Sequence, residues 1–107
     1  MKIFGDGKQS RDFMHVSDLV NAYNLVLEYQ DLIGETINFG TGKETAVGEI
    51  AEYIAKKMNA KIEHVAPRPG EVNHFGCNLD KAKALGFEAK MDIWDGIDQY
   101  IEWRRGI

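Results

Sequence analysis

Residues 5–18 read GDGKQSRDFMHVSD, and the interpretation of the whole chain starts from this stretch. Asp6-Gly7 predicts a tight hairpin turn, because a primed turn needs the positive φ angles that Asp and Gly adopt at low cost. Arg11 follows at a position that the fold itself does not require. A guanidinium beside a glycine-rich turn is suited to bind a phosphate through two parallel hydrogen bonds.

Strand-like residues flank this turn on both sides. Ile3 and Phe4 lead into it, and residues 13–16 lead out of it. Ser17 or Asp18 then offers a side-chain oxygen to backbone N–H groups, which predicts the start of a helix. The stretch is therefore expected to form a unit of turn, strand and capped helix.

Size and composition exclude several classes of protein. A chain of 107 residues is one domain at most, and we treat residues 1–107 as a single domain. A net charge of −4 gives no basic surface for nucleic acid. No apolar run approaches the ~20 residues of a membrane span, so no membrane partner is expected. One cysteine, Cys77, and an N-terminus without a signal-peptide core are typical of the cytoplasm. The scattered histidines predict no metal site.

The rest of the chain alternates between helical and strand patterns. This predicts an α/β fold with a small sheet and about four helices. The expected elements are a helix over 18–30, a strand over 35–39, a helix over 46–58, a strand over 61–65, a loop over 66–77, a helix over 81–85 and a last helix after Asp92.

Apolar spacing and cap residues add detail to these helices. The first helix is expected to bury one stripe, namely Leu19, Val20, Tyr23, Val26 and Leu27. Ala46 stands where the second helix needs a cap and cannot accept from its N–H groups, so either Thr45 caps that helix or its first turn frays. Asp80 and Asp92 are the predicted caps of the last two helices.

Two motifs together resemble a known family. GDGKQSRDF with the following HVSDL is the first, and RPGEV at residues 68–72 is the second. Both resemble the nucleotide-sugar epimerases and dehydratases of the extended short-chain dehydrogenase/reductase superfamily, which include UDP-glucose 4-epimerases. The resemblance covers nearly the whole chain, but only the C-terminal, substrate-binding portion of those enzymes, without their Rossmann half.

The resemblance implies a substrate site for a nucleotide-diphosphate sugar. Arg11 and Arg68 match the family's diphosphate ligands, and Glu71 matches its ribose ligand. Phe75 stands seven residues after Arg68, where epimerases of the family often have a tyrosine near the substrate. The ring can still stack but lacks the hydroxyl, which leaves the identity of the sugar open.

Each of these residues also has a plainer interpretation. Arg11 can pair with a neighbouring aspartate in a solvated patch, and Arg68 can be an ordinary surface arginine. Glu71 can be a solvated loop acid, and Phe75 can anchor its loop on the core. The order and separation of the two motifs favour the binding roles.

The residues of nucleotide-cofactor chemistry are not recognised in this chain. Residues 40–44, GTGKE, match neither a phosphate loop nor a dinucleotide fingerprint. Tyr53 and Lys57 have the spacing of the superfamily's catalytic pair, but they lie well downstream of its usual place. The resemblance implies that NAD and the catalytic Tyr and Lys belong to the Rossmann half, so this chain alone is not expected to catalyse a reaction.

Three hypotheses follow for the function. The chain is the substrate-binding portion of a nucleotide-sugar epimerase or dehydratase, a free-standing nucleotide-sugar-binding module, or a structural relic that dimerises without a ligand. Its abrupt start favours a piece of a longer enzyme or a small reading frame derived from one. The expected partners are a missing Rossmann half or a second copy of the chain. The sequence leaves open which nucleotide sugar is bound, and whether the parent reaction is epimerisation or dehydration.

Overall fold

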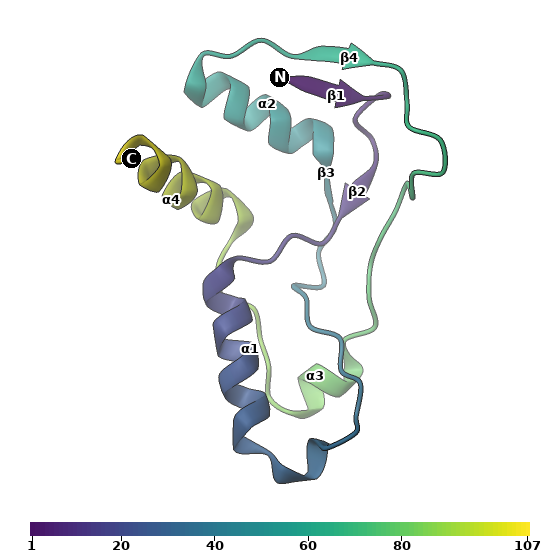
Figure 1. The fold of residues 1–107 in the computed structure, drawn as a ribbon, viewed down its shortest axis with the longest axis vertical. Helices are drawn as coiled ribbons and strands as arrows, with labels where there is room; N and C mark the ends of the chain where they lie inside the picture. The colour runs from purple at the N-terminus through teal and green to yellow at the C-terminus, as the bar shows by residue number, and fades with distance from the viewer. The chain divides into compact units, whose positions relative to one another are not determined.

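The structure is a computed structural model, and it describes residues 1–107 (Figure 1). Its elements confirm an α/β chain with four α-helices and little sheet. In chain order they are β1 (Lys2–Phe4), β2 (Ser10–Arg11), α1 (Val16–Glu28), a 3₁₀ turn (Gln30–Leu32), β3 (Thr45–Ala46), α2 (Val47–Met58), β4 (Glu63–Val65), α3 (Asp80–Ala84) and α4 (Ile93–Arg105). No helix combines the length and the apolar character that crossing a bilayer requires.

Contacts group the chain into two compact units. The first unit is Met1–Asp12 with Lys43–Gly76, and the second is Phe13–Gly42 with Cys77–Ile107.

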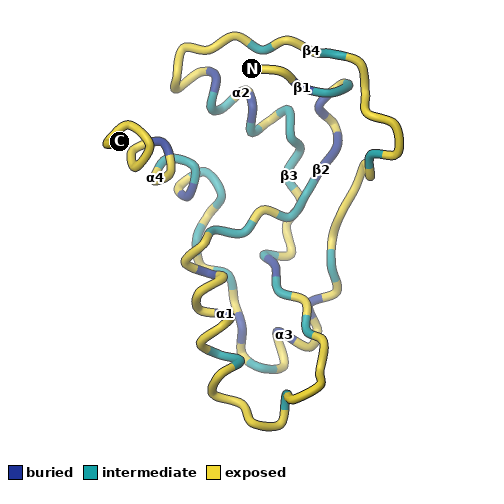
Figure 2. The backbone as a smooth tube through the Cα atoms, viewed as in Figure 1, coloured by how far each residue is buried: buried dark blue, intermediate teal, exposed yellow.

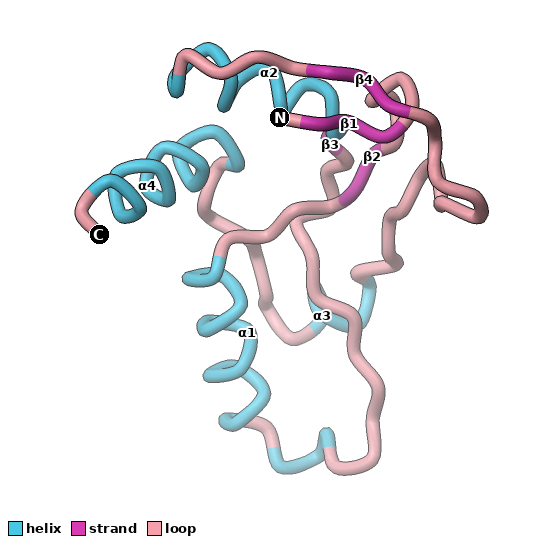
Figure 3. Tube along the Cα trace, turned by 45° about the horizontal axis from the view of Figure 1, so that its top comes forward, coloured by secondary structure: helices cyan, strands magenta, loops and turns pink.

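In the first unit, β1 pairs with β4 in parallel. The magenta segments of the two strands lie side by side in Figure 3. The register places Lys2 opposite Glu63 and Phe4 opposite Val65. Ile3, in the middle of β1, is 3% exposed. The predicted strand over 61–65 is therefore confirmed in its C-terminal part. Parallel strands place their carboxyl ends at the same edge, so the segments that follow β1 and β4 begin side by side.

The predicted hairpin at Asp6-Gly7 is wrong, because β1 and β2 do not pair with each other. β2 pairs antiparallel with β3 instead. Gly5 and Gly7 each have a φ of +78°, but Asp6 does not have a positive φ. Its carboxylate accepts a hydrogen bond from Lys8 N at 2.9 Å, which makes a local Asx turn rather than a primed hairpin turn.

The N-terminus of α2 is capped by backbone rather than by a side chain. Ala46 occupies the cap position without a side-chain hydrogen bond, as expected, and the alternative cap Thr45 lies in β3. Val47 N donates to the carbonyl of Gln9 and Gly48 N donates to that of Gly7, both at 2.8 Å. The segment after β1 thus supplies the acceptors that a helix start requires.

This docking brings two backbones into close contact at Gly7 and Gly48. A Cβ atom on Gly7 would lie 3.0 Å from the Cα of Gly48, and one on Gly48 would lie 3.0 Å from the carbonyl oxygen of Gly7. Neither neighbour is a flexible side-chain end that can move aside. Both positions therefore require glycine.

In the second unit, α1 begins two residues earlier than predicted. Residues 13–15 form no strand, so the strand expected over 13–16 is wrong. The cap is His15, whose Nδ1 accepts from Ser17 N at 3.1 Å. Asp18 lies inside the helix and is 1% exposed. Its two oxygens accept from Lys90 N and Met91 N at 2.9 and 3.0 Å, so this carboxylate joins α1 to the segment before α4.

The predicted buried stripe of α1 is also wrong. Leu19, Val20, Tyr23 and Leu27 are 40%, 51%, 64% and 82% exposed, and Figure 2 colours most of α1 as exposed. The helix instead buries the side that carries Asp18 and Ala22. Apolar residues occur on both sides of α1, so their spacing alone does not select the inward side.

The core of the second unit is a small cluster made by Ala22, Ala82 and Phe87. Ile37 and Phe39 pack against it, with the Phe39 and Phe87 rings edge to face at 5.0 Å. The strand predicted over 35–39 is absent. The alternating apolar residues of that segment pack on this cluster, but no neighbouring strand forms hydrogen bonds with its backbone.

The last two helices lie close to their predicted places. Asp80 is the first residue of α3 rather than its cap, and Asn78 Oδ1 accepts from its N–H at 2.9 Å. Gly86 follows with a φ of +86°, consistent with the predicted stop. Asp92 caps α4 as predicted, accepting from Trp94 N at 3.1 Å and Asp95 N at 3.5 Å.

We predict that Gly7→Ala destabilises the first unit more than Gly70→Ala. Both glycines have a positive φ, which costs alanine about 1 kcal/mol, but nothing lies within 4 Å of a Cβ on Gly70. Gly7→Ala also pushes against Gly48, for a further loss of about 1–3 kcal/mol. Urea unfolding followed by circular dichroism measures the difference. Equal losses in the two variants would contradict the close approach.

Candidate functional site

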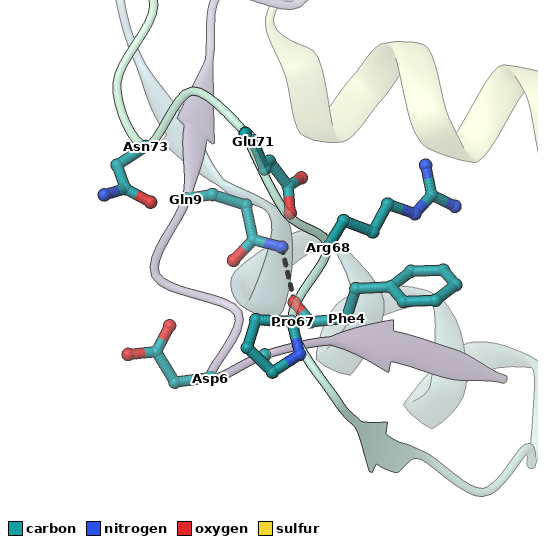
Figure 4. A pocket seen from close by; sticks show the side chains of 9 residues that line it. Phe4, Asp6, Gln9, Pro67, Arg68, Glu71 and Asn73 are labelled. Atoms are coloured by element: carbon teal, nitrogen blue, oxygen red, sulfur yellow. Dashed lines mark hydrogen bonds between the residues drawn. The ribbon is translucent and has the colours of Figure 1, made fainter.

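A pocket of about 490 Å³ lies in the first unit. It is formed by the segment after β1 and the loop after β4, which begin at the same edge of the parallel pair. Figure 4 shows its lining residues, which are Phe4, Gly5, Asp6, Gln9, Pro67, Arg68, Gly70, Glu71 and Asn73. The volume falls in the range of pockets that bind small molecules and cofactors.

Hydrogen bonds hold the wall of the pocket that comes from the segment after β1. Gly5 N donates to the carbonyl of Val65 at 2.8 Å, and Gly5 O accepts from Nδ1 of His64, also at 2.8 Å. Gln9 is 8% exposed, and its Nε2 donates to the carbonyl of Phe4 at 2.9 Å. The dashed line of Figure 4 marks this last bond. The wall is thereby fixed to β4 and to itself.

Arg68 lies over the ring of Phe4. Its Cζ atom is 3.9 Å from the ring centroid, within the range of a cation–π contact. Figure 4 shows both side chains extending in the same direction from opposite walls of the pocket. Pro67 and Pro69 flank Arg68 and restrict the backbone of this part of the loop. The contact keeps a positive charge at the rim of the pocket.

Arg11 contacts Glu71, which lines the pocket. Its Nη2 lies 3.8 Å from Oε1 of Glu71, and its Nη1 donates to the carbonyl of Ser10 at 2.7 Å. The Arg11 and Glu71 side chains are 29% and 26% exposed, so both are shielded from solvent in part. Arg11 itself does not line the pocket, but the carboxylate beside it does.

The residues predicted from sequence differ in how the structure places them. Arg68 and Glu71 line one pocket, and Arg11 is within ion-pair distance of Glu71. Phe75 is 55% exposed and is not among the lining residues, so it is neither a wall of this pocket nor a core anchor. The ligand-binding roles of all four residues remain predictions.

Three lining residues were not singled out from the sequence, namely Phe4, Gln9 and Asn73. Ile3-Phe4 and residues 61–65 both have strand-like patterns, and a parallel pairing between them is the signal that points to residues just past each strand. Gln9 and Asn73 carry no local signal, since their positions depend on contacts between distant segments.

The Tyr53–Lys57 spacing has a local explanation in α2. Lys57 Nζ lies 4.8 Å from the centroid of the Tyr53 ring, an arrangement available to residues four apart on a helix. Neither residue lines the pocket. That the two residues are not a catalytic pair remains a prediction.

A family model described as GDP-mannose 4,6 dehydratase matches residues 1–100. The chain belongs to this family. Among curated proteins of the family, the chain is 36% identical over 105 residues to a protein of Methanocaldococcus jannaschii named as a candidate UDP-glucose 4-epimerase. It is also 34% identical over 107 residues to dTDP-glucose 4,6-dehydratase of Streptomyces niveus. These matches cover 96% of the chain but only 33% and 32% of the relatives, so the chain spans about a third of their length.

Solved structures of epimerase/dehydratase enzymes share the fold of this chain. UDP-glucose 4-epimerase of Thermotoga maritima, solved with UDP-glucose, has a TM-score of 0.88 and 32% identity, covering 99% of this chain and 35% of that one. MoeE5, solved with UDP-glucuronic acid and NAD, has a TM-score of 0.85 and 32% identity, covering 100% and 37%. The resemblance to NAD-dependent nucleotide-sugar epimerases and dehydratases is thereby confirmed for about a third of such an enzyme.

Proposed function

We propose that this chain is the substrate-binding portion of a nucleotide-sugar epimerase or dehydratase. In this proposal, the pocket of the first unit binds the diphosphate and ribose of a nucleoside diphosphate sugar. The supporting observation is that Arg68 and Glu71 line one pocket, and that Arg11, distant from both in sequence, lies within ion-pair distance of Glu71. The chain is not expected to catalyse the reaction by itself.

The two arginines have the chemistry that a diphosphate requires. A guanidinium presents several N–H donors in a planar fork and keeps its charge at every physiological pH. Charge-assisted hydrogen bonds to phosphate oxygens are stronger than neutral ones, and two arginines can share the two phosphates. Arg68 is exposed at the rim, while Arg11 is half-buried beside the wall, so the ligand can lie between them.

Glu71 has the chemistry that a ribose requires. An ionised carboxylate only accepts hydrogen bonds, and vicinal hydroxyls offer two donors at matching distance. The Arg11 guanidinium lies 3.8 Å from the Glu71 carboxylate and holds it beside β2. A carboxylate next to the phosphate ligands thus suits the sugar-phosphate junction of a nucleotide.

The solved relatives support this class of ligand. Two similar structures were solved with UDP-glucose and with UDP-glucuronic acid. The pocket does not determine which nucleotide sugar is bound. Its residues would contact the diphosphate and the ribose, which all such molecules share.

The residues of this chain do not fit NAD. Binding of a dinucleotide phosphate typically uses a glycine-rich turn between a strand and a helix. Gly40 and Gly42 follow an extended segment without a strand, and β3 separates them from α2. The cytoplasmic location of the protein remains a prediction from its sequence.

Calorimetric titration with UDP-glucose and with inorganic pyrophosphate tests the proposed site. Arg11→Ala and Arg68→Ala should each weaken both ligands by roughly tenfold or more, because each removes a charge-assisted contact. Glu71→Gln should weaken UDP-glucose but not pyrophosphate, since only the former carries ribose. Arg104→Ala, on α4 in the second unit, is the control and should bind as the unmodified chain does.

The outcomes separate the three hypotheses. No binding of UDP-glucose at millimolar concentration favours the structural relic. Binding that survives both arginine substitutions contradicts this pocket as the site. Binding lost in both variants supports it, and activity restored by adding a Rossmann half then distinguishes a split enzyme from a free-standing binding module.

We also propose that the exposed apolar face of α1 binds a second copy of this chain. Val16, Val20, Tyr23 and Leu27 recur at i, i+4, i+7 and i+11, and each is more than half exposed. They lie opposite the buried side that carries Asp18 and Ala22. A contiguous apolar stripe of this kind favours association with another helix.

Sedimentation over a range of concentrations measures this association. The unmodified chain should form dimers, and Leu27→Lys should shift it to monomer because a charge on the stripe opposes burial. Asn21→Lys, an exposed position of α1 away from the stripe, should leave the dimer intact. A clean monomer at high concentration would overturn the proposal.

A further inference from the structure

Ser10 joins β2 to the loop that carries Arg68 and Glu71. It is 7% exposed, and its backbone N–H donates to the carbonyl of Asn73 at 2.8 Å. Its hydroxyl lies 3.1 Å from Oε1 of Glu44 and 2.9 Å from Nδ1 of His74. The residue therefore contacts two consecutive positions of the loop, just past the pocket residue Glu71.

The single hydroxyl proton fixes how these contacts are arranged. A serine hydroxyl donates one hydrogen bond and accepts others. Ser10 Oγ donates to Oε1 of Glu44, because a carboxylate oxygen is the acceptor in such a bond. The contact with His74 is then satisfied only if Nδ1 carries a proton and donates to the Ser10 oxygen. The chain of donors runs from His74 through Ser10 to Glu44.

We propose that Ser10 is a positioning residue for the nucleotide-sugar site, acting through this chain of hydrogen bonds. The hydrogen-bonded chain fixes His74, and the Ser10 backbone fixes Asn73, so the end of the loop is attached to β2. Arg11 is the next residue of β2. Attaching the loop to β2 therefore places Glu71 beside Arg11. This inference rests on the proposed function of the pocket.

The environment of Ser10 supports a positioning rather than a reactive role. Its hydroxyl is bound on both sides and the residue is only 7% exposed, which leaves little access for a substrate. The carboxylate of Glu44 also lies against the loop at Gly76, where an added Cβ atom would be 3.9 Å from Glu44 Cδ. Three segments that are distant in sequence, namely β2, the residue before β3 and the loop after β4, thus meet at one hydroxyl.

The tautomer of His74 tests the chain of donors without any ligand. Long-range ¹H–¹⁵N correlation spectra of the full chain, recorded above the pH at which histidine is protonated, distinguish the two ring nitrogens. The proposal expects a protonated, pyrrole-like Nδ1 in His74. In Ser10→Ala that preference should be lost. A pyridine-like Nδ1 in the unmodified chain would overturn the arrangement.

Matched variants test the positioning role. Ser10→Ala should shift the amide resonances of residues 71–74 in the free chain and weaken UDP-glucose roughly tenfold. Ser10→Thr keeps the hydroxyl and should restore both. His74→Asn keeps an N–H donor near the Nδ1 position and should bind as the unmodified chain does, whereas His74→Leu should behave like Ser10→Ala.

The two proposals fail in different ways. If the unmodified chain does not bind UDP-glucose, the proposed function fails, and the amide shifts of residues 71–74 still decide whether Ser10 positions the loop. If the chain binds UDP-glucose and Ser10→Ala binds equally well with an unshifted loop, the role of Ser10 is refuted while the pocket stands.

Discussion

Two backbone hydrogen bonds at the start of α2 constrain the first unit. The carbonyl oxygens of Gly7 and Gln9 accept from the first N–H groups of the helix, in place of the side-chain cap that Ala46 cannot provide. These bonds hold the segment after β1 against α2 and require glycine at both positions of closest approach. The next residues along that segment, Ser10 and Arg11, start β2 from this fixed point. The position of the pocket wall that follows β1 therefore depends on the hydrogen bonds that satisfy the N–H groups at the start of α2.

The parallel pairing of β1 with β4 is the second constraint on the site. It aligns two segments whose sequences are about sixty residues apart, so that a turn and a loop form opposite walls of one pocket. Arg68 is placed over Phe4 across this pocket, and Glu71 is placed beside Arg11. The arrangement uses ordinary backbone pairing to assemble groups that no local motif contains. The charges that gather there, two guanidinium groups and a carboxylate, suit a molecule that carries both phosphates and hydroxyls.

The sequence predicted well those features that depend on neighbouring residues. The Asp92 cap, the poor cap at Ala46 and the stop at Gly86 each rest on interactions within a few positions. The features that depend on distant segments were predicted badly. The turn at Asp6-Gly7 has hairpin residues, but its strands pair elsewhere, with partners that only the tertiary structure selects. Asp18 has the residue type of a cap, yet it accepts from Lys90 and Met91, because a buried carboxylate is better satisfied by two backbone donors there. The candidate site followed the same rule. The two motifs pointed to Arg11, Arg68 and Glu71, whose binding roles remain predictions, while the positions of Gln9, Ser10 and Asn73 depend on contacts between segments.

The convergence of two guanidinium groups on a pyrophosphate is the central claim, and an amide-resolved NMR titration with UDP-glucose tests it most directly. The account predicts saturable shifts confined to the first unit, at residues 5–11 and 67–74, with the backbone amides of Gly7, Arg11 and Gly70 among those that move. Shifts that map to the second unit, or an absence of saturable shifts at millimolar ligand, would contradict it.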